Sequence, residues 1–377
     1  MAVTTVPAAG RAGRVVSDDL ESCVGRLAPE LAGMAGKHVL VTGGAGFLGY
    51  YLLQVLLRRN EEVSGGDAIR ITVVDNYARG VPRWLDALQS DQLRLIAHDV
   101  TQPLDAEAGP FDFIIHAASI ASPSFYRQHP IETMDANVTG VRLLLDRARA
   151  QQDAGHPVSK FLYFSSSEIY GDPEADAIPT PETYPGRVSS TGPRACYDES
   201  KRYGETLSVN YARAYGLPVV IVRPFNNYGP GLKISDRRVI PDFARDILAG
   251  RDLVLHSDGA PTRTFCYVAD AIVGYYKALG RGRPGEAYNI GTERPEVSIW
   301  QLAERMAAVG RELFGYPGTI ARRASADPQY LTDNPQRRCP DIAKARRELA
   351  FTPEIDLTEG LRHTLLWYAD YREAEEA

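Results

Sequence analysis

Val39-Leu40-Val41-Thr42-Gly43-Gly44-Ala45-Gly46-Phe47-Leu48-Gly49 is the stretch that decides the fold of this 377-residue chain. An apolar run leads directly into glycines spaced G-x-x-G-x-x-G, and residues 46–59 then have helical periodicity. Glycine permits a tight turn and a close approach of the backbone to a ligand, and the amides at the start of a helix attract anions. The stretch predicts a strand, a glycine turn and a helix that together hold a phosphate group.

Short apolar runs alternate with longer amphipathic stretches from Lys37 onward. Strands are predicted at 38–42, 70–75, 93–97, 112–116, 160–165 and 218–223, and helices at 46–59, 130–149 and 197–215. Nearly continuous apolar strands that alternate with helices indicate an α/β fold with a doubly wound parallel sheet of the Rossmann type. After about residue 230 the pattern is less regular, with helices predicted at 239–250, 267–279, 298–313 and 341–349.

Three regions are predicted. Residues 1–35 form an N-terminal extension with a short helix, because Leu20, Val24, Leu27 and Leu31 recur at helical spacing after Ser17, whose hydroxyl suits an N-cap. Residues 36–230 form the Rossmann domain, which about 262–291 rejoins. Residues 231–377 form mainly a smaller α/β lobe that binds substrate.

Composition narrows the class of protein. The formal net charge is −6 without a prominent basic run, which argues against nucleic acid as the main partner. The four cysteines are far apart and the seven histidines show no metal-ligand spacing, so neither a disulfide framework nor a metal is expected. No stretch approaches eighteen apolar residues. We expect a cytoplasmic protein that is neither secreted nor membrane-spanning.

A carboxylate ends the second predicted strand, Ile71-Thr72-Val73-Val74-Asp75. It can accept hydrogen bonds from a ribose diol and would repel a 2′-phosphate, so NAD is favoured over NADP, although Arg79 lies nearby in the sequence. A structural turn and a surface aspartate are the alternative interpretation. The predicted cofactor residues follow several strands: Gly43, Gly46, Phe47, Leu48, Asp75, Asn76, Asp99, Val100, Ala117, Ala118 and Ser119, with Tyr197 and Lys201 below.

Tyr197 and Lys201 are four residues apart and share one face of a predicted helix. A neighbouring ammonium group stabilises phenolate and lowers a tyrosine pKa that is ordinarily about 10. A serine hydroxyl from Ser165-Ser166-Ser167-Glu168 can hold a substrate oxygen against that phenol. The set suits removal of a proton from an alcohol while a hydride leaves the same carbon; a surface tyrosine–lysine pair is the alternative.

Together these motifs resemble the extended short-chain dehydrogenase/reductase family over roughly residues 37–370. The resemblance rests on the glycine turn, Tyr197/Lys201 and Arg223-Pro224-Phe225-Asn226-Asn227-Tyr228-Gly229-Pro230. It implies a nucleotide-sugar substrate, a tightly held NAD and a homodimer. It also implies that Tyr197 is the base at the sugar C4 hydroxyl, that Lys201 lowers its pKa and binds the nicotinamide ribose, and that Ser166 aligns the hydroxyl.

Four stretches resemble the decarboxylases of UDP-glucuronate within that family: 121–126, 192–199, 262–268 and 333–341. Oxidation of C4 of a glucuronate gives a β-keto acid, which loses CO2 when its electrons spread onto the ketone oxygen. The resemblance assigns Glu168 and Arg263 to the carboxylate end of the sugar. A water held by Arg263 would then donate the proton to C5. Ordinary salt bridges are the alternative for both. The substrate-binding candidates are Tyr126, Ser167, Arg194, Asn226, Asn227, Lys233, Arg238, Arg263 and Arg337.

Two other activities stay open. A 4,6-dehydratase of the family has an Asp before the Glu, where this chain has Ser167, and a 4-epimerase usually lacks the Glu, so Ser-Ser-Glu favours decarboxylation. A non-catalytic NAD-binding regulator would need no proton-transfer set.

Ser166 stands where the decarboxylases usually have threonine, and the loop 184–190 also departs from their pattern. A looser pocket would then release some UDP-4-keto-pentose before hydride return. Sequence does not separate UDP from TDP.

Overall fold

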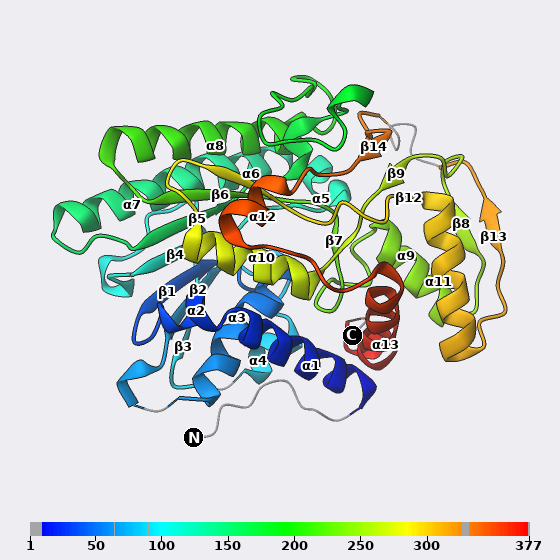
Figure 1. The fold of residues 1–377 in the computed structure, drawn as a ribbon, viewed down its shortest axis with the longest axis horizontal. Helices are drawn as coiled ribbons and strands as arrows, with labels where there is room; N and C mark the ends of the chain where they lie inside the picture. Colours follow the sequence, from blue (N-terminus) through cyan, green and yellow to red (C-terminus); the bar gives the residue numbers. More distant parts are fainter. Residues whose placement is uncertain (1–9, 64, 89, 326–331, 376–377) are drawn as a thin grey trace.

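A seven-stranded parallel sheet forms the centre of the molecule (Figure 1). This computed structural model describes residues 10–63, 65–88, 90–325 and 332–375. The strand order is β3-β2-β1-β4-β5-β6-β11, which confirms the predicted doubly wound fold. The strands are β1 (His38–Thr42), β2 (Arg70–Asp75), β3 (Leu93–Ala97), β4 (Phe113–His116), β5 (Lys160–Phe164), β6 (Val219–Pro224) and β11 (Ala287–Ile290). The first six match their predicted bounds to within one residue.

The order of the strands places a ligand-binding crevice beside β1. Chain order runs outward from β1 through β2 to β3, and then resumes on the other side at β4. Val39 of β1 pairs with Ile71 of β2 on one side and with Phe113 of β4 on the other. In open parallel sheets, ligands bind beyond the carboxyl ends of the strands at such a switch point.

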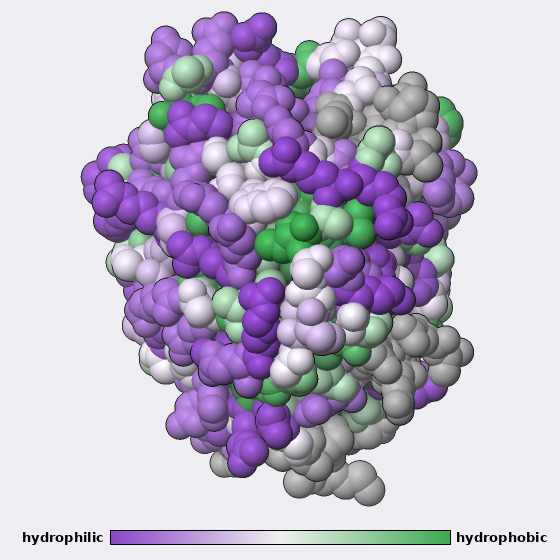
Figure 2. Space-filling model, turned by 90° about the vertical axis from the view of Figure 1, so that its right-hand side faces the viewer, coloured by the Kyte–Doolittle hydropathy of each residue, from purple (hydrophilic) through white to green (hydrophobic). Residues whose placement is uncertain are grey.

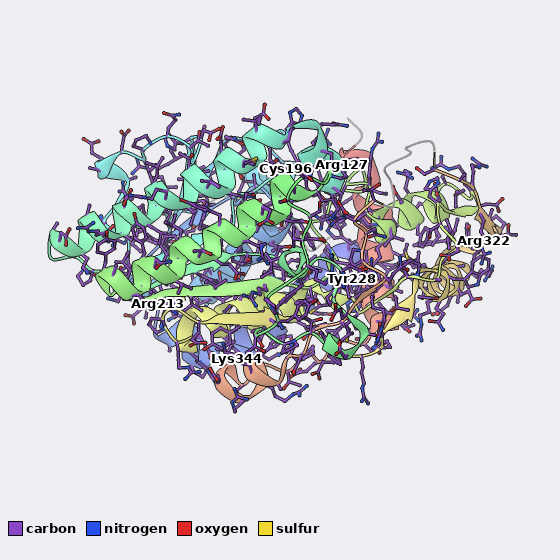
Figure 3. All side chains as sticks on the ribbon, turned by 90° about the horizontal axis from the view of Figure 1, so that it is seen from above. Arg127, Cys196, Arg213, Tyr228, Arg322 and Lys344 are labelled. Carbon is purple, nitrogen blue, oxygen red and sulfur yellow. The ribbon has the colours of Figure 1, made fainter. Side chains whose placement is uncertain are left out.

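Both faces of the sheet are covered by helices, which explains its continuous apolar strands. Val39 and Val41 pack into a core with α3 (Phe47–Glu61) and α10 (Val268–Arg281), whereas Leu40 packs into a second core. That second core includes residues of α7 (Val141–Asp153) and α8 (Ala195–Tyr215). In Figure 3, Cys196 and Arg213 mark the two ends of α8 along its face of the sheet.

The helix predicted at 130–149 is interrupted. It consists of α6 (Pro130–Asp135), a π-helical turn at Ala136–Gly140, and α7. Asn137 in the wide turn donates from Nδ2 to Ser200 Oγ on α8, at 2.9 Å. A Cβ at Gly140 would lie 2.9 Å from Val100 Cγ2, so the turn also packs closely against the segment after β3. Neither of these long-range contacts can be predicted from the local hydrophobic periodicity of the sequence.

The remaining elements form a smaller lobe and short connections. The lobe contains α9 (Val239–Leu248), β8 (Leu253–Leu255), α11 (Ile299–Phe314) and β13 (Ile320–Arg322), which lie together on the right of Figure 1. Two further small sheets join β7 (Asn227–Tyr228) to β10 (Cys266–Tyr267), and β12 (Val297–Ser298), β9 (Thr262–Arg263) and β14 (Arg337–Arg338). The other helices are α2 (Ala28–Ala32), α4 (Arg83–Ala87), α5 (Pro123–Gln128), α12 (Ala343–Leu349) and α13 (Leu357–Glu375). Figure 2 shows the outer face of this lobe as mostly hydrophilic.

The N-terminal helix is longer than predicted. α1 (Arg11–Arg26) begins after Gly10, so the prediction that Ser17 caps it is wrong. The helix extends upstream because Ala12, Val15 and Val16 continue its buried face, whereas Ser17 is exposed on the opposite side. Residues 1–9 lie outside the described residues. α1 packs against α3, α10 and α13, and therefore joins parts of the chain that are far apart in sequence.

A buried carboxylate, Asp19, lies at the centre of the α1 contact. The hydroxyls of Tyr51 on α3 and Tyr267 on β10 both donate to Asp19 Oδ2 at 2.6 Å. His363 Nδ1 of α13 lies 3.9 Å from Asp19 Oδ1. Burial raises the Asp19 pKa to about 7, although the two tyrosine hydrogen bonds oppose the shift.

Candidate active site

The glycine turn forms a closely packed cradle at the end of β1. Gly43 has φ of 73°, and a Cβ there would lie 2.6 Å from the Cα of Ala118. The turn therefore touches the Ala117–Ala118 segment after β4, as predicted for strand ends that share one edge of a sheet. Gly46 precedes α3, whose first residues, Phe47 and Leu48, are half-buried. Glycine at position 43 is required by both its backbone conformation and this contact.

Asp75 lies beside the glycine turn. Its Oδ2 accepts the backbone N–H of Ala45 at 3.0 Å and its Oδ1 accepts that of Tyr77 at 2.8 Å. Burial raises its pKa, and these two backbone hydrogen bonds oppose the shift. Each oxygen retains a lone pair for a ribose hydroxyl. Asn76 Nδ2 donates to Asp99 Oδ2 at 3.0 Å, which links the ends of β2 and β3.

These residues fit a dinucleotide. The cradle accommodates no Cβ at Gly43, as a close backbone approach to a pyrophosphate requires. The hydroxyl of Ser119 is buried without a hydrogen-bond partner among the described residues, so it is available to a bound group. Of the other predicted cofactor residues, Val100 follows β3 and its side chain packs against Gly140.

Ser166, Tyr197 and Lys201 come together at the end of β5. The Tyr197 phenol is hydrogen-bonded to Ser166, whose Oγ also accepts the N–H of Glu168 at 3.1 Å. Lys201 Nζ donates to the carbonyl oxygen of Phe164 at 2.8 Å and lies 5.8 Å from the centre of the Tyr197 ring. The strand end thus supplies the serine and anchors the lysine, while α8 supplies the tyrosine.

The pKa of Tyr197 differs from expectation. The sequence predicts a lowered value, but burial raises it to about 12 in this structure, although the Ser166 hydrogen bond and the charge of Arg238 both oppose the shift. Burial also lowers the Lys201 pKa to about 7, despite the Glu205 charge. Tyr197 is therefore mainly a neutral phenol at pH 7, and the phenolate that acts as a base is its minor form.

Glu168 is held between two arginines. Arg194 at the start of α8 and Arg338 on β14 both donate to its carboxylate, the latter through two nitrogens, with Nη2 at 2.7 Å from Oε2. Burial alone would raise the Glu168 pKa, but the two guanidinium groups outweigh it and lower the pKa strongly. The site thus has two arginines for one carboxylate, which leaves positive charge near Tyr197.

Arg263 is buried and bound to the backbone. Its Nη1 donates to the carbonyl oxygens of Thr262 at 2.7 Å and Gln336 at 3.3 Å, and its Nη2 donates to Pro335 O at 2.6 Å and Asn334 Oδ1 at 3.2 Å. Burial and the nearby Arg338 lower its pKa to about 9. Arg263 therefore holds the segment that presents Arg338, which differs from the predicted proton relay.

Arg338 is the residue that the sequence analysis missed. Its neighbour Arg337, the predicted substrate residue, points elsewhere and pairs with Glu296, with Nη2–Oε2 at 2.8 Å. Adjacent residues in a strand face opposite sides, so only one of Arg337 and Arg338 can face Glu168. The pairing of Arg338 with Arg263 across β14 and β9 determines which one does. Exposure agrees, at 7% for the Arg338 side chain and 42% for that of Arg337.

The remaining predicted substrate residues fall into two groups. Near the Glu168 site, the ring of Tyr126 stacks on Tyr197 at 5.1 Å, and Ser167 is buried. Farther along, Lys233 Nζ donates to Arg79 O at 2.7 Å, and Arg238 Nε lies 2.9 Å from Asp236 Oδ1. Asn226 Nδ2 donates to Thr264 O at 2.8 Å, and the amide of Asn227 is buried.

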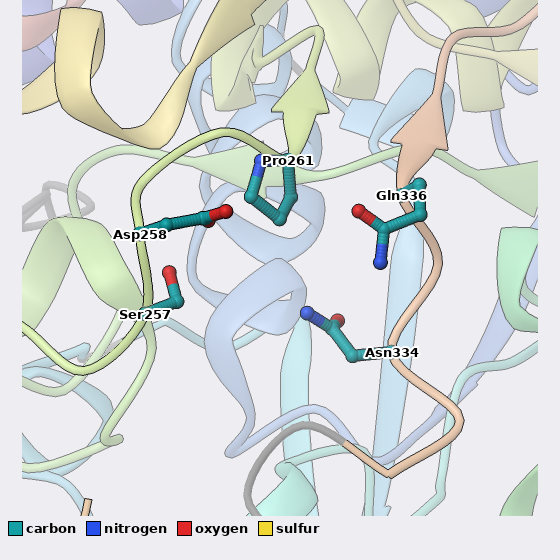
Figure 4. A pocket seen from close by; sticks show the side chains of 5 residues that line it. All are labelled: Ser257, Asp258, Pro261, Asn334 and Gln336. Atoms are coloured by element: carbon teal, nitrogen blue, oxygen red, sulfur yellow. The ribbon is translucent and has the colours of Figure 1, made fainter. Parts of the chain in front are cut away.

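A cavity of about 300 Å³ lies beside the Arg263 anchor. Five side chains line it, from the loop before β9 and the segment before β14 (Figure 4): Ser257, Asp258, Pro261, Asn334 and Gln336. None of them was predicted as a site residue. The cavity therefore adjoins the predicted site without containing its predicted residues.

Residues 39–291 match the model of the NAD dependent epimerase/dehydratase family. The chain belongs to this family. Among curated relatives, UDP-glucuronic acid decarboxylase 1 of Xenopus tropicalis is 37% identical over 88% of this chain and 72% of its own length. UDP-glucuronic acid decarboxylase 3 of Arabidopsis thaliana is 36% identical over 86% of each chain. NAD is accordingly the cofactor, as the glycine turn and Asp75 predict.

Solved structures of this epimerase/dehydratase family have the same fold. An epimerase from Methanothermobacter thermautotrophicus has a TM-score of 0.77 at 26% identity, covering 94% of this chain and 98% of its own. A dTDP-glucose 4,6-dehydratase from Streptomyces venezuelae, with NAD bound, has a TM-score of 0.74 at 28% identity, covering 89% and 98%. Identity is higher with the decarboxylases, in agreement with the Ser-Ser-Glu motif.

Two classes of feature are absent from the described part of this family member. Across residues 10–63, 65–88, 90–325 and 332–375, no helix has the length and apolar character to cross a membrane. Within the same ranges, no cluster of three or more histidine, cysteine or acidic side chains has a metal-binding arrangement.

Proposed function

We propose that this protein catalyses the NAD-dependent decarboxylation of UDP-glucuronate to UDP-xylose, UDP-4-keto-pentose or both. The observation that carries the proposal is the cluster of two arginines around Glu168, adjacent to Ser166 and Tyr197. Its surplus positive charge suits a substrate carboxylate. A 4-epimerase acting on a neutral hexose has no carboxylate to place there, and a 4,6-dehydratase would need an acid at Ser167.

Residues of this chain can act on both reacting groups of the sugar, the C4 hydroxyl and the C6 carboxylate. When bound, NAD supplies the hydride acceptor for C4 and later returns the hydride. As the phenolate, Tyr197 takes the proton of the C4 hydroxyl and becomes the neutral phenol, while Ser166 aligns that oxygen. As CO2 leaves, the neutral phenol and the serine hydroxyl donate hydrogen bonds to the C4 oxygen, where negative charge develops. Arg194 and Arg338 orient the carboxylate, while Glu168 keeps them from over-stabilising it.

The two predicted regions of the chain meet at this site. Ser166, Glu168 and Tyr197 belong to the proposed NAD-binding domain, as does Arg263 in the rejoining segment of about 262–291, whereas Arg338 belongs to the proposed nucleotide-sugar lobe. β9 and β14, which carry these arginines, pair directly with each other. We assign Lys233 and Arg238 to the nucleotide end, because they are two cations near the buried Asp236 and neither of them pairs with Glu168.

We also propose a homodimer and a cytoplasmic location. Ile131 and Met134 on α6 and Tyr203 on α8 are 64%, 43% and 47% exposed, and α6 packs beside α8. Apolar side chains gathered on adjacent helices are typical of a protein interface. The four cysteines are unpaired, which supports a reducing compartment.

The direct test is to supply UDP-glucuronate labelled at C6 and to measure CO2, with and without added NAD. No CO2 in either case would refute the proposal. Tyr197→Phe should abolish turnover while NAD remains bound. NMR of the products would reveal whether keto-pentose accumulates, as serine at position 166 leads us to expect. TDP-glucuronate, assayed in parallel, would define the nucleotide.

A further inference from the structure

One acidic group of the site has no role in the reaction described so far. Asp198 follows Tyr197 on α8 and is only 4% exposed. Among the described residues, its Oδ1 has no hydrogen-bond partner, and its Oδ2 lies 3.9 Å from Arg194 Nε, beyond hydrogen-bonding distance. Arg194 Nε is itself buried and unpartnered. A buried acid and a buried donor that face each other without a hydrogen bond call for an explanation, and a change of bonding during the reaction supplies one.

The surroundings of Asp198 favour its protonated form. The nearby arginines already bind Glu168, and an ionised carboxylate buried without hydrogen bonds is costly. Burial, and then the charge of Glu168, raise the Asp198 pKa to about 8. The charged groups that act on it come from three elements: Arg194 on α8, Glu168 in the turn after β5, and Arg338 and Asp333 on or before β14. Asp198 is therefore neutral at pH 7.

The proposed decarboxylation, on which this inference rests, consumes a proton. Loss of CO2 breaks the C5–C6 bond and leaves its electron pair as an enolate over C5 and the C4 oxygen. A proton must then form a bond with that pair at C5. Tyr197 and Ser166 face the C4 oxygen, and both terminal nitrogens of Arg263 are bound to backbone or amide oxygens. Another acid is needed near the carboxylate end.

We propose that Asp198 is the proton reservoir for C5 and that it acts through Glu168, with which it shares the Arg194 guanidinium. When the substrate carboxylate enters, it competes with Glu168 for the two arginines, so Glu168 becomes more basic. The Asp198 proton moves to Glu168, and Glu168 delivers it to C5 as CO2 departs. The ionised Asp198 is then paired with the unpartnered Nε of Arg194 until water returns a proton. One proton is consumed for each CO2.

The test compares Asp198→Asn with Glu199→Gln in the NAD-loaded enzyme. Asn mimics the neutral carboxyl in shape and hydrogen bonding, so a merely structural role would survive the change. We expect Asp198→Asn to oxidise C4 normally, seen as NADH absorbance in a single turnover. Its formation of CO2 and pentose should be at least about 100-fold slower, the usual scale for a lost general acid. Glu199, a half-exposed neighbour on α8 that pairs with Arg202, should tolerate the change.

The pH profile gives a second readout, without a variant. Because the protonated form is the donor, kcat should be retained below the Asp198 pKa and fall as pH rises above about 8. In Asp198→Asn, kcat should not show this fall above about pH 8. If the variant keeps wild-type CO2 release, or loses NADH formation as well, the reservoir role is overturned. If the wild type itself releases no CO2, the proposed function fails instead.

Discussion

Asp19 and Glu168 are both buried carboxylates, but they differ in what donates to them. Glu168 receives charged donors from Arg194 and Arg338, and its pKa is strongly lowered. Asp19 receives two short hydrogen bonds from neutral tyrosines, and its pKa is raised to about 7. Desolvation is the largest influence on both. Neutral hydroxyls do not offset desolvation, whereas two guanidinium groups do. Glu168 therefore remains charged for function, whereas ionisation of Asp19 destabilises the folded protein at high pH.

The largest effect should come from removing a charged donor at Glu168. Arg338→Met removes the donor that uses two nitrogens and leaves the carboxylate with Arg194 alone, so we expect a loss of up to about 3–5 kcal/mol of unfolding free energy, the cost of breaking a buried ion pair. Urea unfolding would measure the loss. The double variant Arg338→Met/Glu168→Gln should recover part of it, because the carboxylate that lost a donor is gone and Asp198, relieved of the Glu168 charge, can ionise beside Arg194. Equal losses in the single and double variants would contradict the electrostatic explanation.

The Asp19 cluster should show the opposite sensitivity to pH. Its raised pKa means that the folded state binds a proton that the unfolded state releases above about pH 4, so stability falls as pH rises toward 7. The Asp19 component should be a loss of about 4 kcal/mol between pH 4 and 8, because each unit of pKa difference is worth about 1.4 kcal/mol. In Asp19→Asn this component should vanish. Asp18→Asn, an exposed neighbour, is the control; the same slope in both variants would refute the assignment.

The smallest loss of stability is expected at position 337, which is adjacent in sequence to position 338, where the largest loss is expected. Arg337→Met breaks a half-exposed pair with Glu296 and should cost less than about 1 kcal/mol in the same urea assay. The contrast between positions 337 and 338 isolates burial, because both arginines lie on β14 and each pairs with a glutamate. A loss at 337 comparable to that at 338 would show that side-chain exposure does not decide the cost.

The sequence predicted the central sheet well because its strands carry local signals. Residues 38–42 and 160–165 are apolar runs buried on both faces, and the glycine turn fixes where the first strand ends. The start of α1 was mispredicted because the Ser17 cap signal is local, whereas the contacts that extend the helix are with α10 and α13. The interruption at Ala136–Gly140 likewise depends on Ser200 and Val100.

At the site, residue types were easier to predict than their environments. Tyr197, Ser166 and Lys201 come together as their spacing indicates, yet the Tyr197 pKa is raised, since burial is not visible in a four-residue spacing. The sequence marks 337 and 338 equally as arginines. Only the pairing of β14 with β9 determines which one faces Glu168.

The position of α1 has a consequence for synthesis of the protein on the ribosome. α1 is the first helix that the structure describes, yet its buried face packs against α13, more than three hundred residues later in the chain. The part of its apolar face that packs against α13 therefore stays uncovered until nearly the whole polypeptide has emerged, although α3 is available early. Contacts of such long sequence separation form late and leave apolar surface exposed meanwhile. We expect nascent chains that end before residue 357 to be bound by chaperones through this helix.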